Sequence, residues 1–186
     1  MEITDIHNYF KNRISEINDL AKRGDPWVFL CCSSFVDYLV RATYDKEANA
    51  NDYKEFIMNY LSLIDIRYKD FEYQSGAKDL PDQMYHILRC GIIHSFSLIP
   101  DSNSLRKGGR IRSILLAHNK NGATHFKAMT ESGYDSVIFT AESFAADLEK
   151  LVEKIFTEIV IIDSAIEVNI KSWWTKYTPI MGLTIT

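Results

Sequence analysis

The chain has only three cysteines among its 186 residues: Cys31, Cys32 and Cys90. Cys31 and Cys32 are adjacent, and neighbouring residues seldom reach the Cα separation that a relaxed disulfide requires. The sequence therefore excludes a disulfide-stapled fold, and it predicts reduced thiols in a reducing compartment.

An excess of basic residues is also missing, because 25 Asp and Glu residues outnumber 21 Lys and Arg residues. The formal net charge of −4 excludes a surface that is basic overall, as in histone-like proteins or proteins that coat DNA non-specifically. A local basic patch is still compatible with this balance.

The sequence lacks an apolar run long enough to cross a membrane. The longest apolar stretch, residues 27–40, is interrupted by Ser33, Ser34 and Asp37, and it falls short of the roughly 20 residues that a span needs. The segment at residues 1–5 is acidic and lacks the basic-then-apolar layout of a signal peptide. We therefore expect a soluble, cytoplasmic protein with no membrane association.

The residues that are present predict one domain over residues 1–186 that is mainly helical. An apolar stripe from Ile3 to Ala21 predicts a first helix, closed by Gly24. A second helix over about residues 26–43 is apolar nearly all round, so we expect it in the middle of a bundle.

Two further helices are predicted before residue 100. Asp52 and Glu55 resemble a capping box, which indicates the start of a third helix. A fourth helix begins near Leu80 and runs to about Leu98, where Pro100 stops it.

The pattern changes to strands at about residues 103–140. Residues 111–117 and 123–129 predict a β-hairpin turning around Asn121-Gly122, and residues 136–140 could add a third strand. On this interpretation His118 and His125 lie at exposed strand ends. Helical spacing returns at residue 141 and continues to about residue 170, which predicts a last helix. The tail over about residues 171–186 is apolar, and we expect it to pack on the protein's own core. The alternative is that the tail contacts a partner.

The fourth helix carries the residues with chemical potential. An α-helical projection places Leu80, Met84 and Leu88 on a core face and His86, Arg89, Cys90 and Ile93 opposite, with His94 on the flank. A face of this mixed character indicates a second packed contact, which a partner subunit can supply. His86, Cys90 and His94 cannot all bind one zinc ion, because ligands eight residues apart are separated by about 12 Å along a straight helix. A site with two of these ligands, completed from elsewhere in the chain, is the alternative.

The spacing Arg-x4-His, from Arg89 to His94, on a late helix of a compact bundle resembles the HEPN superfamily. The resemblance implies a mainly α fold, an antiparallel helical bundle with a small antiparallel β-hairpin insertion. It also implies a homodimer in which two copies of the motif line one cleft, and metal-independent cleavage of RNA without a cofactor. Many members act in toxin–antitoxin, CRISPR-associated and abortive-infection systems, so an antitoxin partner is implied as well.

Two positions depart from the pattern of that family. Cys90 stands where active members often carry asparagine, aspartate or histidine after the arginine. Phe96 stands where toxins paired with minimal nucleotidyltransferases have a tyrosine that accepts adenylylation. Because phenylalanine has no hydroxyl group, we expect no adenylylation at this position.

The two motif residues suit the cleavage of RNA without a metal. Histidine titrates near neutral pH, so His94 can donate or accept a proton. The guanidinium of Arg89 offers paired donors to phosphate oxygens on which charge builds in the transition state. One chain supplies one such histidine, and a two-fold dimer would supply the base and the acid together.

A basic loop follows the motif helix. Arg106, Lys107, Arg110 and Arg112 lie in residues 104–112, which contain no acidic residue, and we predict that they contact RNA phosphates. The alternative is a solvated charged loop. Likewise, Arg89 and His94 could be interface residues of a non-catalytic module for RNA binding, nucleotide binding or dimerisation.

Overall fold

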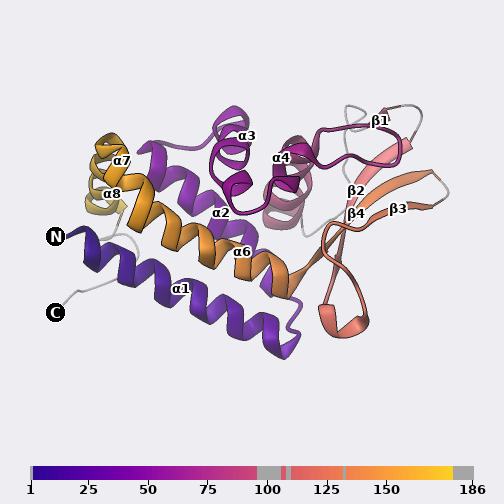
Figure 1. Cartoon of the computed structure of the whole chain (residues 1–186), viewed down its shortest axis with the longest axis horizontal. Coiled ribbons are helices and arrows are strands. Elements are labelled where there is room, and N and C mark those ends of the chain that lie inside the picture. The colour runs from indigo at the N-terminus through magenta and orange to yellow at the C-terminus, as the bar shows by residue number, and fades with distance from the viewer. Residues whose placement is uncertain (1, 96–105, 108–109, 132, 178–186) are drawn as a thin grey trace.

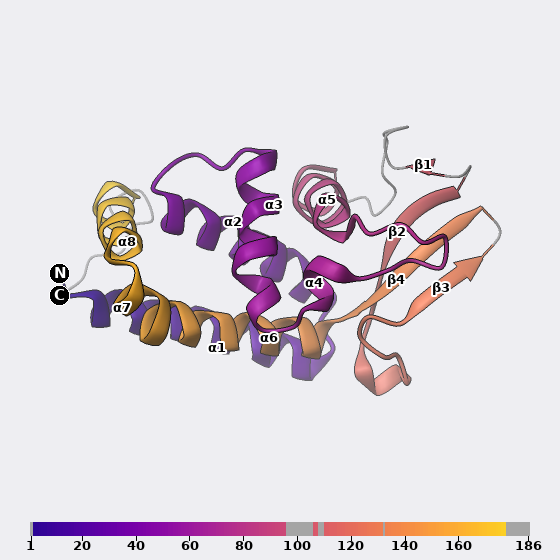
Figure 2. The same cartoon turned by 45° about the horizontal axis from the view of Figure 1, so that its top comes forward.

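The computed structural model describes residues 2–95, 106–107, 110–131 and 133–177. Within these ranges the chain is mainly helical, and a small sheet lies between two helical parts of the sequence. Figures 1 and 2 both show the sheet at one end of the molecule and the last helix at the other. The helical segments are α1 (Ile3–Arg23), α2 (Val28–Tyr44), α3 (Ala50–Asn59), α4 (Arg67–Asp70), α5 (Leu80–Gln83), η2 (Met84–Ser95), α6 (Ala141–Lys154), η5 (Ile155–Ile159), α7 (Val160–Ile162) and α8 (Ser164–Tyr177), with short 3₁₀ turns at η1 (Leu61–Leu63) and η4 (Asn119–Asn121).

Helices α1, α2 and α6 form the centre of the bundle. The apolar stripe of α1 is buried as predicted, and Gly24 ends the helix in the left-handed conformation with φ of 73°. Helix α2 packs against α1, α6, α8 and η2, which confirms its predicted central position. Burial of its apolar surface from several sides stabilises this arrangement through the hydrophobic effect.

The third helix begins three residues earlier than the capping-box prediction. Asn49 is the N-cap, and its side-chain oxygen accepts hydrogen bonds from the backbone N–H groups of Asn51 and Asp52. Asp52, predicted as the start, is the third residue of the helix, and its carboxylate accepts a hydrogen bond from the backbone N–H of Asn49. The helix ends at Asn59, and the 3₁₀ turn η1 follows it.

The fourth predicted helix starts at Leu80, as expected, but most of it is a π-helix. After the single α-helical segment α5, η2 continues to Ser95 with hydrogen bonds of the i→i+5 type. Leu80, Met84 and Leu88 are fully buried, in agreement with the predicted core face. The predicted end near Leu98 lies outside the described residues.

The sheet has four strands in the order β1-β2-β4-β3, and it corrects the predicted hairpin. Its strands are β1 (Arg106–Lys107), β2 (Arg110–Ala117), β3 (Ala128–Glu131) and β4 (Tyr134–Thr140). Strand β2 pairs with β4 in parallel, and β3 pairs with β4 in an antiparallel hairpin. The two segments predicted to pair around Asn121-Gly122 are therefore not neighbours, whereas the third predicted strand is present as β4.

The helix predicted over residues 141–170 is broken at Asp163. This residue leaves the helical conformation, and its carboxylate accepts a hydrogen bond from the backbone N–H of Ala165 at the start of α8. Helix α8 extends to Tyr177, so residues 171–177 are helical and the predicted tail begins too early. Trp173 and Trp174 are buried, which confirms that this part packs on the protein's own core.

Candidate functional site

Arg89 lies on the π-helix η2, where its guanidinium faces helix α2. Its Nε donates a hydrogen bond to Oδ1 of Asp37 over 3.3 Å, and its guanidinium carbon lies 5.6 Å from the ring centre of Tyr85. The side chains of Arg89 and Asp37 are 17% and 15% exposed, so the pair lies near the surface without being fully solvated. Burial acts to lower the pKa of Arg89, but the charge of Asp37 and its hydrogen bond together outweigh burial. The pKa of Arg89 is therefore raised, and the guanidinium stays cationic.

Asp37 also binds a second arginine of its own helix. Its Oδ2 accepts a hydrogen bond from Nε of Arg41 over 2.9 Å, and Arg41 extends to Glu47 over 2.7 Å. The carboxylate of Asp37 thus bridges two guanidinium groups, one from α2 and one from η2. Tyr53 is buried beside this group, and burial raises the pKa of its hydroxyl, which stays protonated.

The other motif residue, His94, belongs to the same helix η2, but its side chain lies outside the described residues. A π-helix joins residues five apart by backbone hydrogen bonds. Positions 89 and 94 are therefore on successive turns of one side of the helix backbone. In an α-helix the same spacing rotates position 94 away from position 89, so the α-helical projection placed His94 on the flank of the face that holds Arg89.

The four basic residues predicted to contact RNA do not share one environment. Arg110 is exposed on β2. Arg106 and Lys107 form β1, and their side chains lie outside the described residues. Arg112 contradicts the prediction, because it is 1% exposed and its Nη2 lies 2.6 Å from Oδ2 of Asp79.

Arg112 begins a run of three buried residues on β2, which continues through Ser113 and Ile114. The neighbouring buried polar groups are Asp135, which accepts a hydrogen bond from the backbone N–H of Ser75, and the hydroxyl of Tyr73. Burial raises the pKa of Tyr73, with Asp79 contributing in the same direction. These side chains form a polar cluster between the sheet and α5, so Arg112 has a structural role.

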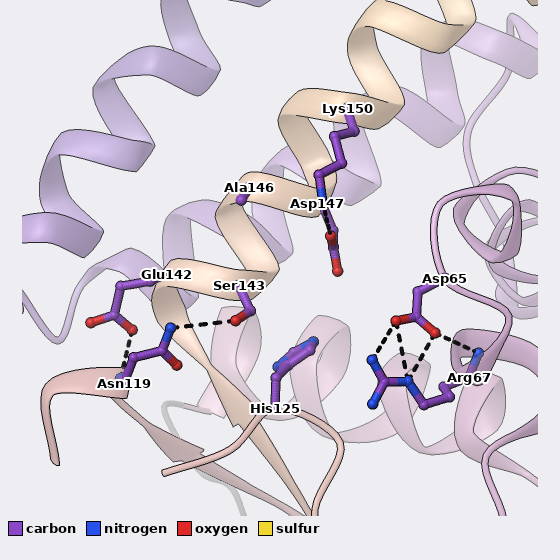
Figure 3. A pocket seen from close by; sticks show the side chains of 9 residues that line it. All are labelled: Asp65, Arg67, Asn119, His125, Glu142, Ser143, Ala146, Asp147 and Lys150. Carbon is purple, nitrogen blue, oxygen red and sulfur yellow. Dashed lines mark hydrogen bonds and ion pairs between the residues drawn. The ribbon is translucent and has the colours of Figure 1, made fainter. Parts of the chain in front are cut away.

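The structure also reveals a polar cavity that the sequence did not indicate. It has a volume of about 400 Å³, lies between the start of α6, η4 and the segment before α4, and is shown in Figure 3. Its lining residues are Asp65, Arg67, Asn119, His125, Glu142, Ser143, Ala146, Asp147 and Lys150.

His125 stands at the wall of this cavity and is only 9% exposed, which contradicts its predicted position at an exposed strand end. The backbone N–H of Thr140 donates to Nδ1 of His125 over 2.9 Å, which assigns the ring proton to Nε2. Nε2 lies 3.5 Å from the hydroxyl of Tyr68, which donates to Oδ2 of Asp147 over 3.2 Å. Desolvation lowers the pKa of His125 to about 4, so the ring is neutral at pH 7.

The backbone next to His125 is strained. Phe126 has φ of 60°, a left-handed conformation that is unusual for a bulky residue and costs about 1–3 kcal/mol. The Phe126 ring is buried against Tyr68, and the guanidinium of Arg67 lies 4.6 Å from its ring centre. No pattern in the sequence marks this conformation, because neither asparagine nor glycine occupies the position.

The charges around the cavity are largely paired with one another. Arg67 binds the carboxylate of Asp65 through Nε and Nη2, the shorter contact being 2.6 Å. Lys150 binds Asp147 over 3.0 Å. His118, the other predicted exposed histidine, is half-buried and lies 3.4 Å from the carboxylate of Glu142.

Two further properties concern metals and membranes. In the part of the chain that the structure describes, histidine, cysteine and acidic side chains form no group of three or more that could hold a metal ion. Among the same residues, each helix is too short or too polar to span a bilayer. Cys32 is buried, whereas Cys31 and Cys90 are half-buried, and none of the three forms a disulfide.

Comparison with protein-family models, with curated proteins and with solved structures finds no match to this chain.

Proposed function

We propose that this protein is a HEPN-like, metal-independent endoribonuclease that acts as a homodimer. The observation that carries the proposal is the placement of Arg89 and position 94 on successive turns of one helix, with the guanidinium of Arg89 held by Asp37 near the surface. A mainly helical fold is consistent with the resemblance to the HEPN superfamily.

In the proposed reaction one side chain stabilises negative charge on the phosphate and another transfers protons. Arg89 binds the non-bridging oxygens of the scissile phosphate, where negative charge grows in the transition state. His94 removes the proton from the 2′-hydroxyl or protonates the departing 5′-oxygen. Two copies related by a two-fold axis divide these proton transfers between them, so the dimer is part of the mechanism.

The basic residues that follow the motif helix have a role in RNA binding in this proposal. Arg106, Lys107 and Arg110 follow the motif helix in sequence and bind the phosphate backbone without reading bases. Arg112 is left out of this set because it is buried. A toxin of this kind works in the cytoplasm and is held inactive by an antitoxin partner.

A decisive experiment incubates RNA with the wild type and with His94→Ala in the presence of a metal chelator. We expect cleavage by the wild type, products ending in a cyclic phosphate, and loss of cleavage in the variant. His86→Ala is the matched control, because His86 lies on the same helix and contacts Asp82 rather than Arg89. Equal cleavage by His94→Ala would reject the proposal.

A second candidate, a non-catalytic RNA-binding or dimerisation module, is favoured by the ion pair of Arg89 with Asp37 inside one protomer. This module would retain η2 for assembly and would not cleave RNA. A charge placed at Ile93 would then dissociate the dimer, as measured by analytical ultracentrifugation, while the chelator assay shows no cleavage in any variant.

A further inference from the structure

The carboxylate of Asp37 joins helix α2 to the proposed site on η2. One oxygen lies 3.3 Å from Nε of Arg89 and the other lies 2.9 Å from Nε of Arg41. Because both guanidinium groups bind one carboxylate, they are direct neighbours at the boundary between the two helices. Nothing in the Arg-x4-His pattern includes a residue of α2.

We infer that Arg41 is a second phosphate-binding residue of this site and that Asp37 is the positioning residue that holds Arg41 and Arg89 side by side. The inference rests on the proposed function, since it assigns the site a polynucleotide ligand. Guanidinium groups match phosphate oxygens in geometry and charge. Two adjacent guanidinium groups fit consecutive phosphates of one strand, so the site favours an oligonucleotide over a mononucleotide.

The exposure of the acidic partners supports this division of roles. Glu47, the other partner of Arg41, is 69% exposed, and exposed ion pairs of this kind contribute only about 0.2–1 kcal/mol. A phosphate can therefore replace Glu47 at small cost. Asp37 is 15% exposed and binds both arginines, so it stays in place and offsets the repulsion between two like charges.

The role of Arg41 is tested by the salt dependence of RNA binding. A His94→Ala protein, which does not degrade the probe, is titrated with a labelled single-stranded RNA at several salt concentrations. Adding Arg41→Ala should weaken binding and make the slope of log K against log salt less steep by about 0.7, the value for one lost phosphate contact. Adding Arg13→Ala, which removes an exposed arginine paired with Glu16 on α1, should leave the slope unchanged.

The outcomes of this titration separate the two proposals. An unchanged slope in Arg41→Ala overturns the assignment of Arg41 and leaves the proposed function intact. If Arg41→Ala reduces the slope but the wild-type protein does not cleave RNA, Arg41 is supported as a phosphate ligand and the nuclease is rejected. Absence of RNA binding by the His94→Ala protein overturns both.

The role of Asp37 is tested by kinetics, because a purely structural residue would act through stability. Asp37→Asn keeps the shape of the side chain and removes its charge, so kcat should fall roughly 10- to 100-fold through misplacement of Arg89. KM should not rise, since both cations are retained, and Asp37→Glu should recover part of kcat. Wild-type kcat in Asp37→Asn, or a fall explained by a lower Tm, would overturn the positioning role.

Discussion

Nη2 of Arg112 lies 2.6 Å from Oδ2 of Asp79, and this contact ties strand β2 to the residue that precedes helix α5. The Arg112 side chain is 1% exposed, and its Nε and Nη1 have no hydrogen-bond partner among the described residues. A buried ion pair of this kind is weak evidence for net stability, but removal of one partner leaves the other charge without compensation.

Arg112→Met should therefore destabilise the fold strongly. The expected loss in the free energy of unfolding is about 3–5 kcal/mol, since the carboxylate of Asp79 loses its partner. Arg110→Met, two residues earlier on the same strand and exposed, is the matched control and should change stability by about 0.5 kcal/mol or less. Urea denaturation measures both values, and equal stabilities of the two variants would show that Arg112 is not a structural residue.

The buried His125 should make stability depend on pH. Its pKa is about 4 in the folded state against 6.5 for the unperturbed group. Between these values the unfolded chain binds more protons than the folded one, so stability is complete above pH 6.5 and falls as the pH drops towards 4, by about 3 kcal/mol in total. His125→Gln should lose this pH-dependent part of the free energy of unfolding. Urea denaturation of the wild type and the variant at several pH values from 4 to 7 measures the difference. Parallel curves for both proteins would contradict the prediction.

The N-cap of α3 provides a local test of helix formation. Asn49→Ala removes the oxygen that accepts hydrogen bonds from two backbone N–H groups at the helix start, and should cost about 1 kcal/mol. Asn49→Asp should retain most of the stability, because a carboxylate accepts the same bonds and suits the helix dipole. Thermal unfolding distinguishes them, with Asn49→Ala expected to melt about 2–4 °C lower. Equal Tm values for the two variants would argue against the cap.

The sequence predicted elements well where periodicity and burial agree. The stripe of α1 and the all-round apolar character of α2 predicted their places in the bundle, because hydrophobic spacing directly reflects which side of a helix meets the core. The cap of α3 was misplaced by three residues since Asn49 and Asp52 are both good N-cap residues. Only the backbone geometry distinguishes between them.

The arrangement of the sheet depended on contacts between distant segments. Asn121-Gly122 is a strong turn signal, and Gly122 is indeed left-handed with φ of 74°, but the turn closes a 3₁₀ segment rather than a hairpin. Strand β2 instead pairs with β4, where the hydroxyls of Ser113 and Ser136 lie 2.6 Å apart. Alternation along a single strand indicates which face is buried but not which strand is its neighbour.

The candidate sites likewise depend on contacts between distant segments, which the sequence pattern does not reveal. Arg89 could be selected from the sequence because arginine and histidine recur at a known spacing on one apolar helix. The partnership with Asp37 could not, since 52 residues separate them in the chain. A π-helix leaves no trace in a sequence whose residues would also suit an α-helix, and the burial of Arg112 and His125 follows from packing between distant elements.

The final prediction separates the charge of Arg89 from its shape. Arg89→Lys keeps a cation that can bind phosphate and Asp37, but loses the planar fork that contacts two oxygens at once. If the proposed reaction holds, RNA cleavage should fall roughly 100-fold, because one directed donor to the transition state is lost, while the salt slope of RNA binding stays constant. Arg13→Lys on the exposed face of α1 is the control and should cleave normally. Full cleavage by Arg89→Lys would show that positive charge alone is required, and that the orientation imposed by Asp37 has no catalytic consequence.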